Sequence, residues 1–262
     1  MLMTAGCSFV WGDELHGFDN DPPTHWDLTF THLLGQKLGI EHKNLGVCGA
    51  CNDKIFRQAT DFLHENPGKV THIVIMWSAL QRKELVEYMP PERQVKIGRQ
   101  NDVTQFSSLR TELIHTPQKR DRWADWYDNA YDSKTDILHL LVMMKNMEVI
   151  ARAAGIKLIQ GSFHQRNWSN ILSVLTDKVP DDFDVDVLPS FASIDSIPDY
   201  KKWLKNSLGS LDDNSRVGLG RGKDLYTLAI EGDDLKPYGH PGEKTQVVFT
   251  DFLYEKFIDM DA

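Results

Sequence analysis

Two short segments of this sequence carry residue types suited to nucleophilic chemistry. Ser8 stands in the segment GCSFVWG (6–12), just beyond an apolar run. A serine in a turn after a strand presents its hydroxyl at the edge of a sheet, which suits an activated nucleophile, although a helix cap is the commoner role. His240 stands in the turn YGHPG (238–242), where proline and glycine fix the backbone and leave the ring free. It is either a general base or an ordinary surface histidine.

A third segment, NLGVCGACND (44–53), could complete such a site. Its glycines let the backbone turn sharply and approach a ligand, and the N–H of Gly49 could stabilise an oxyanion; a plain strand-to-helix turn is the alternative. Asn52 either contacts the nucleophile turn or caps the next helix. Ser78 and His164 each follow an apolar run, so we expect them at the same edge as possible donors or substrate contacts, with a loop histidine as the alternative for His164.

The elements that would position these residues alternate along the chain. Apolar runs predict strands, and helical spacing with capping and stop residues predicts helices. The expected strands are 2–5, 43–46, 70–77 and 156–160, and the expected helices are 28–38, 54–64, 133–154 and 242–257. Alternating strands and helices predict an α/β fold with a parallel sheet between two helical layers. Ligands of such sheets bind beyond the carboxyl ends of the strands, where the candidate residues lie.

Two stretches fit this alternation poorly. Residues 85–132 lack clean periodicity and are expected to form an insertion or cap with some helix. Residues 161–232 are rich in proline and aspartate and are expected to form a long loop with one or two short helices. Four aromatic side chains of the insertion either stack on sugar faces or form its core: Trp123, Trp126, Tyr127 and Tyr131. We expect one domain over residues 1–262.

Composition narrows the function classes. The 262 residues carry a formal net charge of −9, which disfavours binding to nucleic acid. No run approaches the roughly 20 apolar residues of a membrane span, and the first residues lack the pattern of a signal peptide, so we expect a cytoplasmic protein without membrane contact. The three cysteines do not suggest a disulfide framework. The C-x-x-C at 48–51 is expected to be a tight turn rather than a redox or zinc motif.

Taken together, these segments resemble the conserved blocks of the SGNH/GDSL hydrolase family. Residues 6–9 look like its first block, 44–52 like its second, 73–78 like its third and 239–242 like its last, in the family's order. The segments around Ser8 and Gly49 are also similar to SGNH-like proteins of phages and marine bacteria. The resemblance implies a three-layer, flavodoxin-like α/β/α fold.

The resemblance also implies roles for individual residues. Ser8 would be the nucleophile and His240 the base, with the backbone N–H groups of Ser8 and Gly49 holding the oxyanion. The sequence departs from the family in three places: Cys7 replaces the first-block aspartate, the third block has no asparagine, and Pro237 replaces the acid three residues before the histidine. Ser78 or His164 could replace the missing donor. Asp234, six residues before the histidine, could be the orienting acid, with Asp233 and Glu231 as alternatives.

The function expected from this resemblance is hydrolysis of an ester or O-acyl group such as acetyl, with carbohydrate as one class of carrier. No metal or organic cofactor is implied, and the partner is a small-molecule or carbohydrate ester. The alternative is an SGNH-fold binding or structural protein, of the kind a phage could encode, in which catalysis is weak or lost. Acyl transfer would use the same residues. The oligomeric state is left open.

Overall fold

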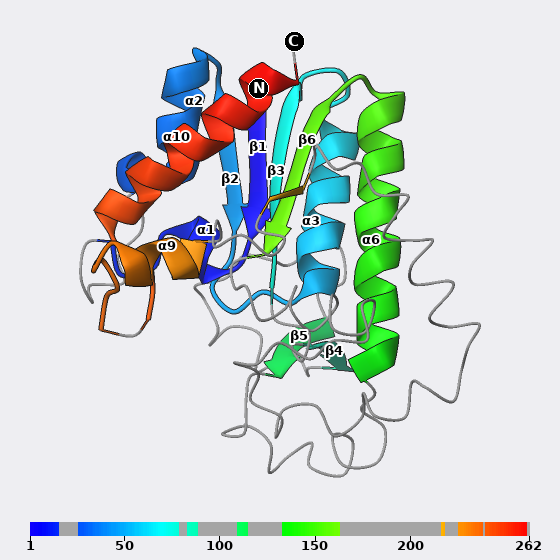
Figure 1. Ribbon diagram of the computed structural model, residues 1–262. Coiled ribbons are helices and arrows are strands. Elements are labelled where there is room, and N and C mark those ends of the chain that lie inside the picture. The colour runs from blue at the N-terminus through cyan, green and yellow to red at the C-terminus, as the bar shows by residue number, and fades with distance from the viewer. Residues whose placement is uncertain are drawn as a thin grey trace, which may run out of the picture.

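The computed structural model describes residues 1–15, 26–78, 83–88, 109–114, 133–162, 216–217, 225–237 and 239–260. Within these ranges a parallel sheet forms the centre of the molecule (Figure 1). Its strands are β1 (Leu2–Gly6), β2 (His42–Gly46), β3 (His72–Trp77), β6 (Lys157–Ser162) and β7 (Arg216–Val217).

The strand order in the sheet is β2-β1-β3-β6-β7, and every neighbouring pair is parallel. This is the flavodoxin-like order, in which the chain leaves β1 toward one edge and returns to build the other edge from β3 onward. The reversal opens a crevice between the carboxyl ends of β1 and β3, where ligands of such sheets bind. The segment that follows β1 contains Ser8, and Ser78 directly follows β3.

Helices cover both faces of the sheet. The helices α2 (Phe30–Leu38) and α10 (Glu243–Asp259) lie together on one face, while α3 (Asn52–Glu65) and α6 (Ser133–Ala153) lie on the other (Figure 1). The short helices are α1 (Ser8–Trp11), α9 (Leu225–Glu231) and a 3₁₀ turn at Trp26–Leu28. The expected three-layer α/β fold is therefore confirmed.

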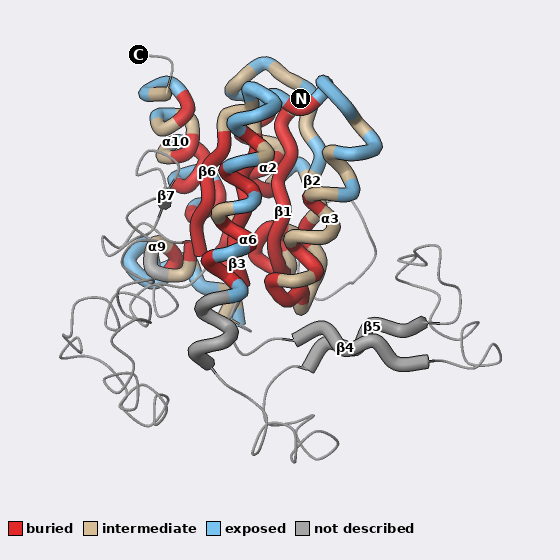
Figure 2. The backbone as a smooth tube through the Cα atoms, turned by 90° about the vertical axis from the view of Figure 1, so that its right-hand side faces the viewer, coloured by how far each residue is buried: buried red, intermediate tan, exposed pale blue. Residues whose placement is uncertain are grey.

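The core lies between the sheet and these helices (Figure 2). The β-branched run of β3 is buried on both faces, from Ile73 to Trp77, as a strand inside a two-sided parallel sheet must be. The indole N–H of Trp77 donates to the side chain of Gln160, 3.1 Å away, and the Gln160 amide donates to the Met144 carbonyl, also 3.1 Å away. These bonds satisfy buried polar groups while they join β3, β6 and α6.

The structure differs from the sequence expectations in two places. The described residues in and next to the expected insertion form an antiparallel pair, β4 (Lys83–Tyr88) and β5 (Leu109–Ile114), which was not expected. The expectation of some helix in the insertion stays a prediction. Helix α3 has Cys51 at its N-cap without a side-chain hydrogen bond, so Asn52 does not cap it. The described part of the expected long loop does contain a short helix, α9, together with β7. The extent of the domain stays a prediction.

No helix in the described part of the chain is both long enough and apolar enough to cross a membrane.

Candidate active site

Ser8 is held at the carboxyl end of the central strand β1. The strand ends at Gly6, and Ser8 opens the single turn of α1 immediately afterwards. The turn is closed by backbone bonds from Trp11 to the Cys7 carbonyl and from Gly12 to the Ser8 carbonyl, both 3.0 Å. Gly12 has φ 85°, which suits glycine and lets the chain reverse directly behind the serine. Ser8 is mostly buried, at 6% exposure, and the first N–H groups of a helix have no partner within it.

The turn after β2 braces the backbone around Ser8. The Asn44 side chain donates to the Val10 carbonyl at 2.7 Å and accepts from the Gly46 N–H at 2.7 Å. The Val47 N–H donates to the Gly6 carbonyl at 3.0 Å, which ties the two turns together. These bonds bring the loop that carries Gly49 beside the loop that carries Ser8.

Gly46, the last residue of β2, lies directly against the α1 turn, so a substitution there tests whether these contacts position Ser8. A Cβ at Gly46 would overlap the backbone of Val10 and Trp11, which cannot move aside as a flexible side chain can. Gly46→Ala is expected to destabilise the fold by about 1–3 kcal/mol and to slow any chemistry of Ser8, because the backbone that carries it must shift. Thermal melts and fluorophosphonate labelling would measure the two effects.

Gly39→Ala is the matched control for this prediction. Gly39 has φ 67° and open space around it, so alanine there strains the backbone without touching Ser8. It should lower the melting temperature and leave labelling in the folded state unchanged. Normal labelling of Gly46→Ala would show that the brace does not position the serine.

His240 reaches the site from the loop between α9 and α10. The loop is a tight turn: the Gly239 N–H donates to the Lys236 carbonyl and the Lys236 N–H donates to the His240 carbonyl, both at 2.8 Å. Gly239 has φ 87°, which favours glycine. The imidazole packs against the Phe9 ring, 5.2 Å between centroids. The loop and the α1 turn together restrict the orientation of the histidine.

The imidazole lies between a serine and a carboxylate. His240 Nε2 is 2.9 Å from Ser8 Oγ, and His240 Nδ1 is 2.6 Å from Glu14 Oε2. The same carboxylate oxygen also accepts from the backbone N–H of His240, at 3.3 Å. The Glu14 side chain is 7% exposed and the His240 side chain 16%. A serine, a histidine and a carboxylate in contact in this order are the arrangement of a serine hydrolase triad.

The carboxylate that contacts His240 Nδ1 is that of Glu14, whereas the expected orienting acid, Asp234, is engaged elsewhere. The Asp234 carboxylate instead accepts the Thr245 backbone N–H at 2.7 Å, as a capping residue does for the start of α10. Its carbonyl accepts the Gly242 N–H at 2.7 Å. Asp234 therefore fixes the loop that carries His240 and does not contact the imidazole.

Glu14 was not found from the sequence because its only local signal is a carboxylate in the loop after the nucleophile turn. Its partner is 226 residues away. In the structure a second signal is visible: Glu14 has φ 66°, in the left-handed region that non-glycine residues rarely occupy. Such strain is held in place by surrounding structure and tends to occur at functional sites.

Of the other expected site residues, Gly49, Asn52 and Ser78 lie in the described part of the chain. Gly49 has φ 76° in the turn after β2. Asn52 and Ser78 contact each other: the Asn52 side chain donates to the Ser78 carbonyl at 3.2 Å and accepts its N–H at 2.7 Å. Both are nearly or fully buried, so the pair joins the start of α3 to the end of β3. Roles for Gly49, Asn52 and Ser78 toward an oxyanion stay predictions. His164 and the four aromatic residues of the insertion lie outside the described residues.

Asp13 lies beside His240, and the Cys48 thiol is hydrogen-bonded to Asp13. Asp13 Oδ2 is 3.7 Å from His240 Nε2. Burial raises the pKa of the Cys48 thiol, and the charge of Asp13 and a hydrogen bond to it raise the pKa further. The thiol therefore stays protonated and is a poor nucleophile. All three cysteines are free thiols, and the described residues contain no group of three side chains that could hold a metal ion.

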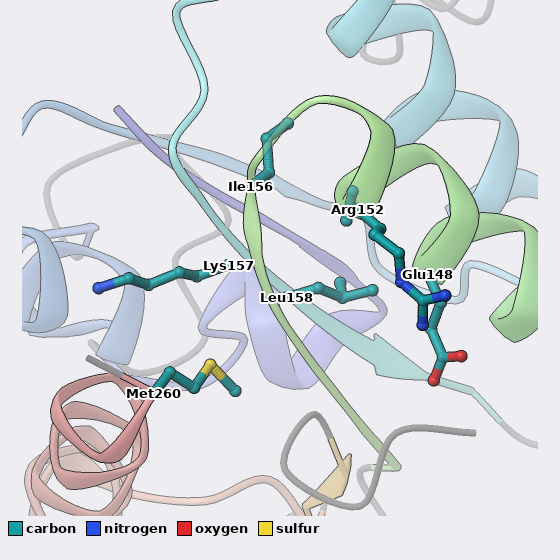
Figure 3. Close-up of a pocket in the computed structure, with 7 residues that line it drawn as sticks. Glu148, Arg152, Ile156, Lys157, Leu158 and Met260 are labelled. Atoms are coloured by element: carbon teal, nitrogen blue, oxygen red, sulfur yellow. The ribbon is translucent and has the colours of Figure 1, made fainter. Parts of the chain in front are cut away.

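Among the described residues, two cavities lie at the amino ends of the strands, away from Ser8. One, of about 200 Å³, lies between the end of α6 and the first residues of β6, with Glu148, Arg152 and Lys157 on its wall (Figure 3). The other, of about 480 Å³, lies between the ends of α3 and α6 and the residues that precede β3. Neither is lined by Ser8 or His240, so these cavities do not form part of the candidate site.

No family model and no curated protein matches the sequence. Three solved structures align along nearly the whole chain. A protein of the G-D-S-L family from Desulfitobacterium hafniense DCB-2 is 13% identical, with a TM-score of 0.42 over 97% of this chain and 98% of that chain. The psychrotrophic esterase EstA from Pseudoalteromonas sp. is 12% identical, with a TM-score of 0.45 over 99% and 97%.

The third structure is TesA, which is 12% identical with a TM-score of 0.41 over 97% of this chain and 96% of that chain. The chain is thus similar in structure, at low sequence identity, to a G-D-S-L family protein, to the esterase EstA and to TesA. None of the three structures addresses the resemblance to a phage or marine bacterial subgroup, which stays a prediction.

Proposed function

We propose that the protein is a serine hydrolase that cleaves an ester or O-acyl group, with Ser8 as nucleophile, His240 as general base and Glu14 as orienting acid. One observation carries the proposal. His240 lies within hydrogen-bonding distance of Ser8 through one ring nitrogen and of Glu14 through the other, 2.9 Å and 2.6 Å away. These residues come from opposite ends of the chain, so only the fold brings them together.

The contacts define the proton positions. An ionised carboxylate accepts hydrogen bonds and donates none, so Glu14 holds the ring tautomer with its proton on Nδ1. The lone pair on Nε2 then faces the Ser8 hydroxyl and can accept its proton. As His240 becomes an imidazolium, the Glu14 carboxylate beside it stabilises the charge.

The reaction would proceed in two halves. Ser8 Oγ attacks the acyl carbon while His240 Nε2 takes its proton, and the oxyanion forms beside the N–H groups of Ser8 and Gly49. Nε2 then protonates the leaving alcohol as the bond from the carbonyl carbon to the alcohol oxygen breaks. Water, deprotonated by the same nitrogen, releases the acid from Ser8. An acceptor alcohol in place of water would give acyl transfer, and a carbohydrate is one class of carrier.

The experiment is labelling by a fluorophosphonate, followed by mapping of the modified peptide. The folded chain is expected to react at Ser8, with fluoride leaving as the Oγ–P bond forms. Ser8→Ala should not label, and the heat-unfolded chain should not label either, because the histidine is then no longer beside the serine. A well-folded chain that does not react would contradict the proposal.

The binding-protein alternative has one observation in its favour. The expected third-block asparagine is absent, and the Asn52 amide is engaged with the Ser78 backbone. Loss of one oxyanion donor typically costs about 10²–10³ in rate. Labelling without turnover of any acyl ester would therefore favour a chain that keeps its nucleophile and has lost efficient catalysis.

A further inference from the structure

Two carboxylates lie next to His240, at opposite sides of the ring. Glu14 is buried and contacts Nδ1, whereas the Asp13 side chain is 33% exposed and its Oδ2 lies 3.7 Å from Nε2. The Asp13 backbone N–H donates to the Ser8 carbonyl at 3.1 Å, which fixes its position relative to the nucleophile. The proposed triad uses only Glu14, so the role of the second carboxylate is open.

Asp13 lies on the leaving-group side of the proposed site. The nitrogen that protonates a leaving alcohol must come within roughly 3 Å of its oxygen. Because Asp13 Oδ2 is 3.7 Å from that nitrogen, the alcohol oxygen lies within about 7 Å of the carboxylate. A charge carried two carbons from the alcohol oxygen would therefore interact strongly with Asp13 when the alcohol portion is turned toward that carboxylate.

The negative charge of Asp13 is not offset by a cationic partner among the described residues. Within the described part of the chain its ion-pair partner is His240, which is charged only when protonated. Its other neighbour is the Cys48 thiol, whose pKa is raised by burial, by the charge of Asp13 and by a hydrogen bond to it. A neutral thiol can hold a carboxylate in place without cancelling its charge.

We infer that Asp13 is a specificity residue that favours acyl esters whose alcohol portion carries a positive charge and disfavours those whose alcohol portion is anionic. This inference rests on the proposed function. Unlike charges attract and like charges repel over 4–7 Å even in partly solvated surroundings. The formal net charge of −9 adds a weaker, longer-range preference for cations.

The test uses three acetyl thioesters that have the same type of scissile bond and differ in the charge of the thiol portion. Acetylthiocholine is cationic, S-(3,3-dimethylbutyl) thioacetate is its neutral isostere, and S-(2-sulfonatoethyl) thioacetate is anionic. Water cleaves the carbonyl carbon–sulfur bond of each to give acetate and a thiol. The native chain should show the highest kcat/KM for the cation and the lowest for the anion. Asp13→Asn should reduce the cation-to-anion ratio about tenfold.

The ratio separates charge selection from structural damage. Damage to the site, or altered basicity of His240, would slow all three substrates alike and leave the ratio unchanged. Asp61→Asn is the matched control: it removes the same charge from an exposed position of α3, nine residues beyond the start of that helix, and should not change the ratio. Added salt should lower the cation-to-anion ratio of kcat/KM in the native chain, because it screens exposed charges.

Three results would overturn the inference: an unchanged ratio in Asp13→Asn, a native chain indifferent to substrate charge, or no turnover of any of the three. Fluorophosphonate labelling distinguishes these from failure of the proposed function. A chain that labels at Ser8 but shows no charge preference loses only the role of Asp13. A chain that neither labels nor turns over loses both.

Discussion

Ser8→Ala is expected to lower kcat/KM for any ester that the native chain hydrolyses by roughly a million-fold. The substitution removes the only atom that can form the acyl-enzyme bond in the proposed mechanism. His240→Ala should cost about as much, since a serine hydroxyl without a base at its Oγ is a weak nucleophile. The measurement is steady-state hydrolysis of a p-nitrophenyl ester, with circular dichroism to confirm that each variant is folded.

The double variant, Ser8→Ala with His240→Ala, sharpens this prediction. Residues that act as one catalytic unit are strongly non-additive, so the double variant should be no slower than either single variant. Each should keep a residual rate above that in water, which comes from binding and from oxyanion stabilisation. If the fold-losses of the two single variants multiplied in the double variant, the two residues would act independently, contrary to the 2.9 Å contact between Nε2 and Oγ.

Glu14→Gln is expected to lower kcat about ten-thousand-fold. The glutamine amide keeps the shape of the side chain but loses its charge, and its NH₂ group can face Nδ1 and favour the unproductive ring tautomer. The loss should appear in kcat rather than KM, because the interaction strengthens as the imidazolium forms. Stability should change little, since the left-handed backbone at residue 14 is retained.

Two controls accompany this variant. Glu243→Gln makes the same chemical change in the first turn of α10, where Glu243 makes a 3.4 Å ion pair with Lys236, and should leave kcat within a few-fold. Asp234→Asn keeps an oxygen that can accept the Thr245 N–H and should also leave kcat nearly unchanged. If Asp234→Asn removed activity and Glu14→Gln did not, the assignment of the orienting acid would be reversed.

Much of the fold was predictable from local signals. The buried run of β3 and the stop at Gly39 depend on side-chain type and backbone freedom alone, and both appear within a residue or two of the expected positions. The antiparallel β4–β5 pair was missed because its strands show no clean alternation of apolar and polar residues. The cap of α3 was missed because Asn52, a good capping residue by type, bonds instead to the backbone of Ser78 at the end of β3.

The candidate site likewise contains residues that were recognisable from local sequence and one that was not. Ser8 and His240 were recognisable because each stands in a turn whose glycines and proline shape the backbone locally. The structure brings the two within hydrogen-bonding distance, as the resemblance implied. The orienting acid was assigned to Asp234 because that residue lies close to the histidine in sequence. The fold gives that place to Glu14, whose left-handed backbone points the carboxylate at a ring more than two hundred residues away.

The sequence by itself determined the order of the main parallel strands and of the helices that cover the sheet, the turns that carry the serine and the histidine, and the acidic character of the chain. These depend on periodicity, backbone freedom and composition, which act over a few residues or over the whole chain. Only the tertiary structure decided which carboxylate contacts Nδ1, which one lies exposed beside Nε2, and that Asn52 holds Ser78. Such pairings depend on where loops from distant parts of the chain meet at one sheet edge, and no local pattern encodes them.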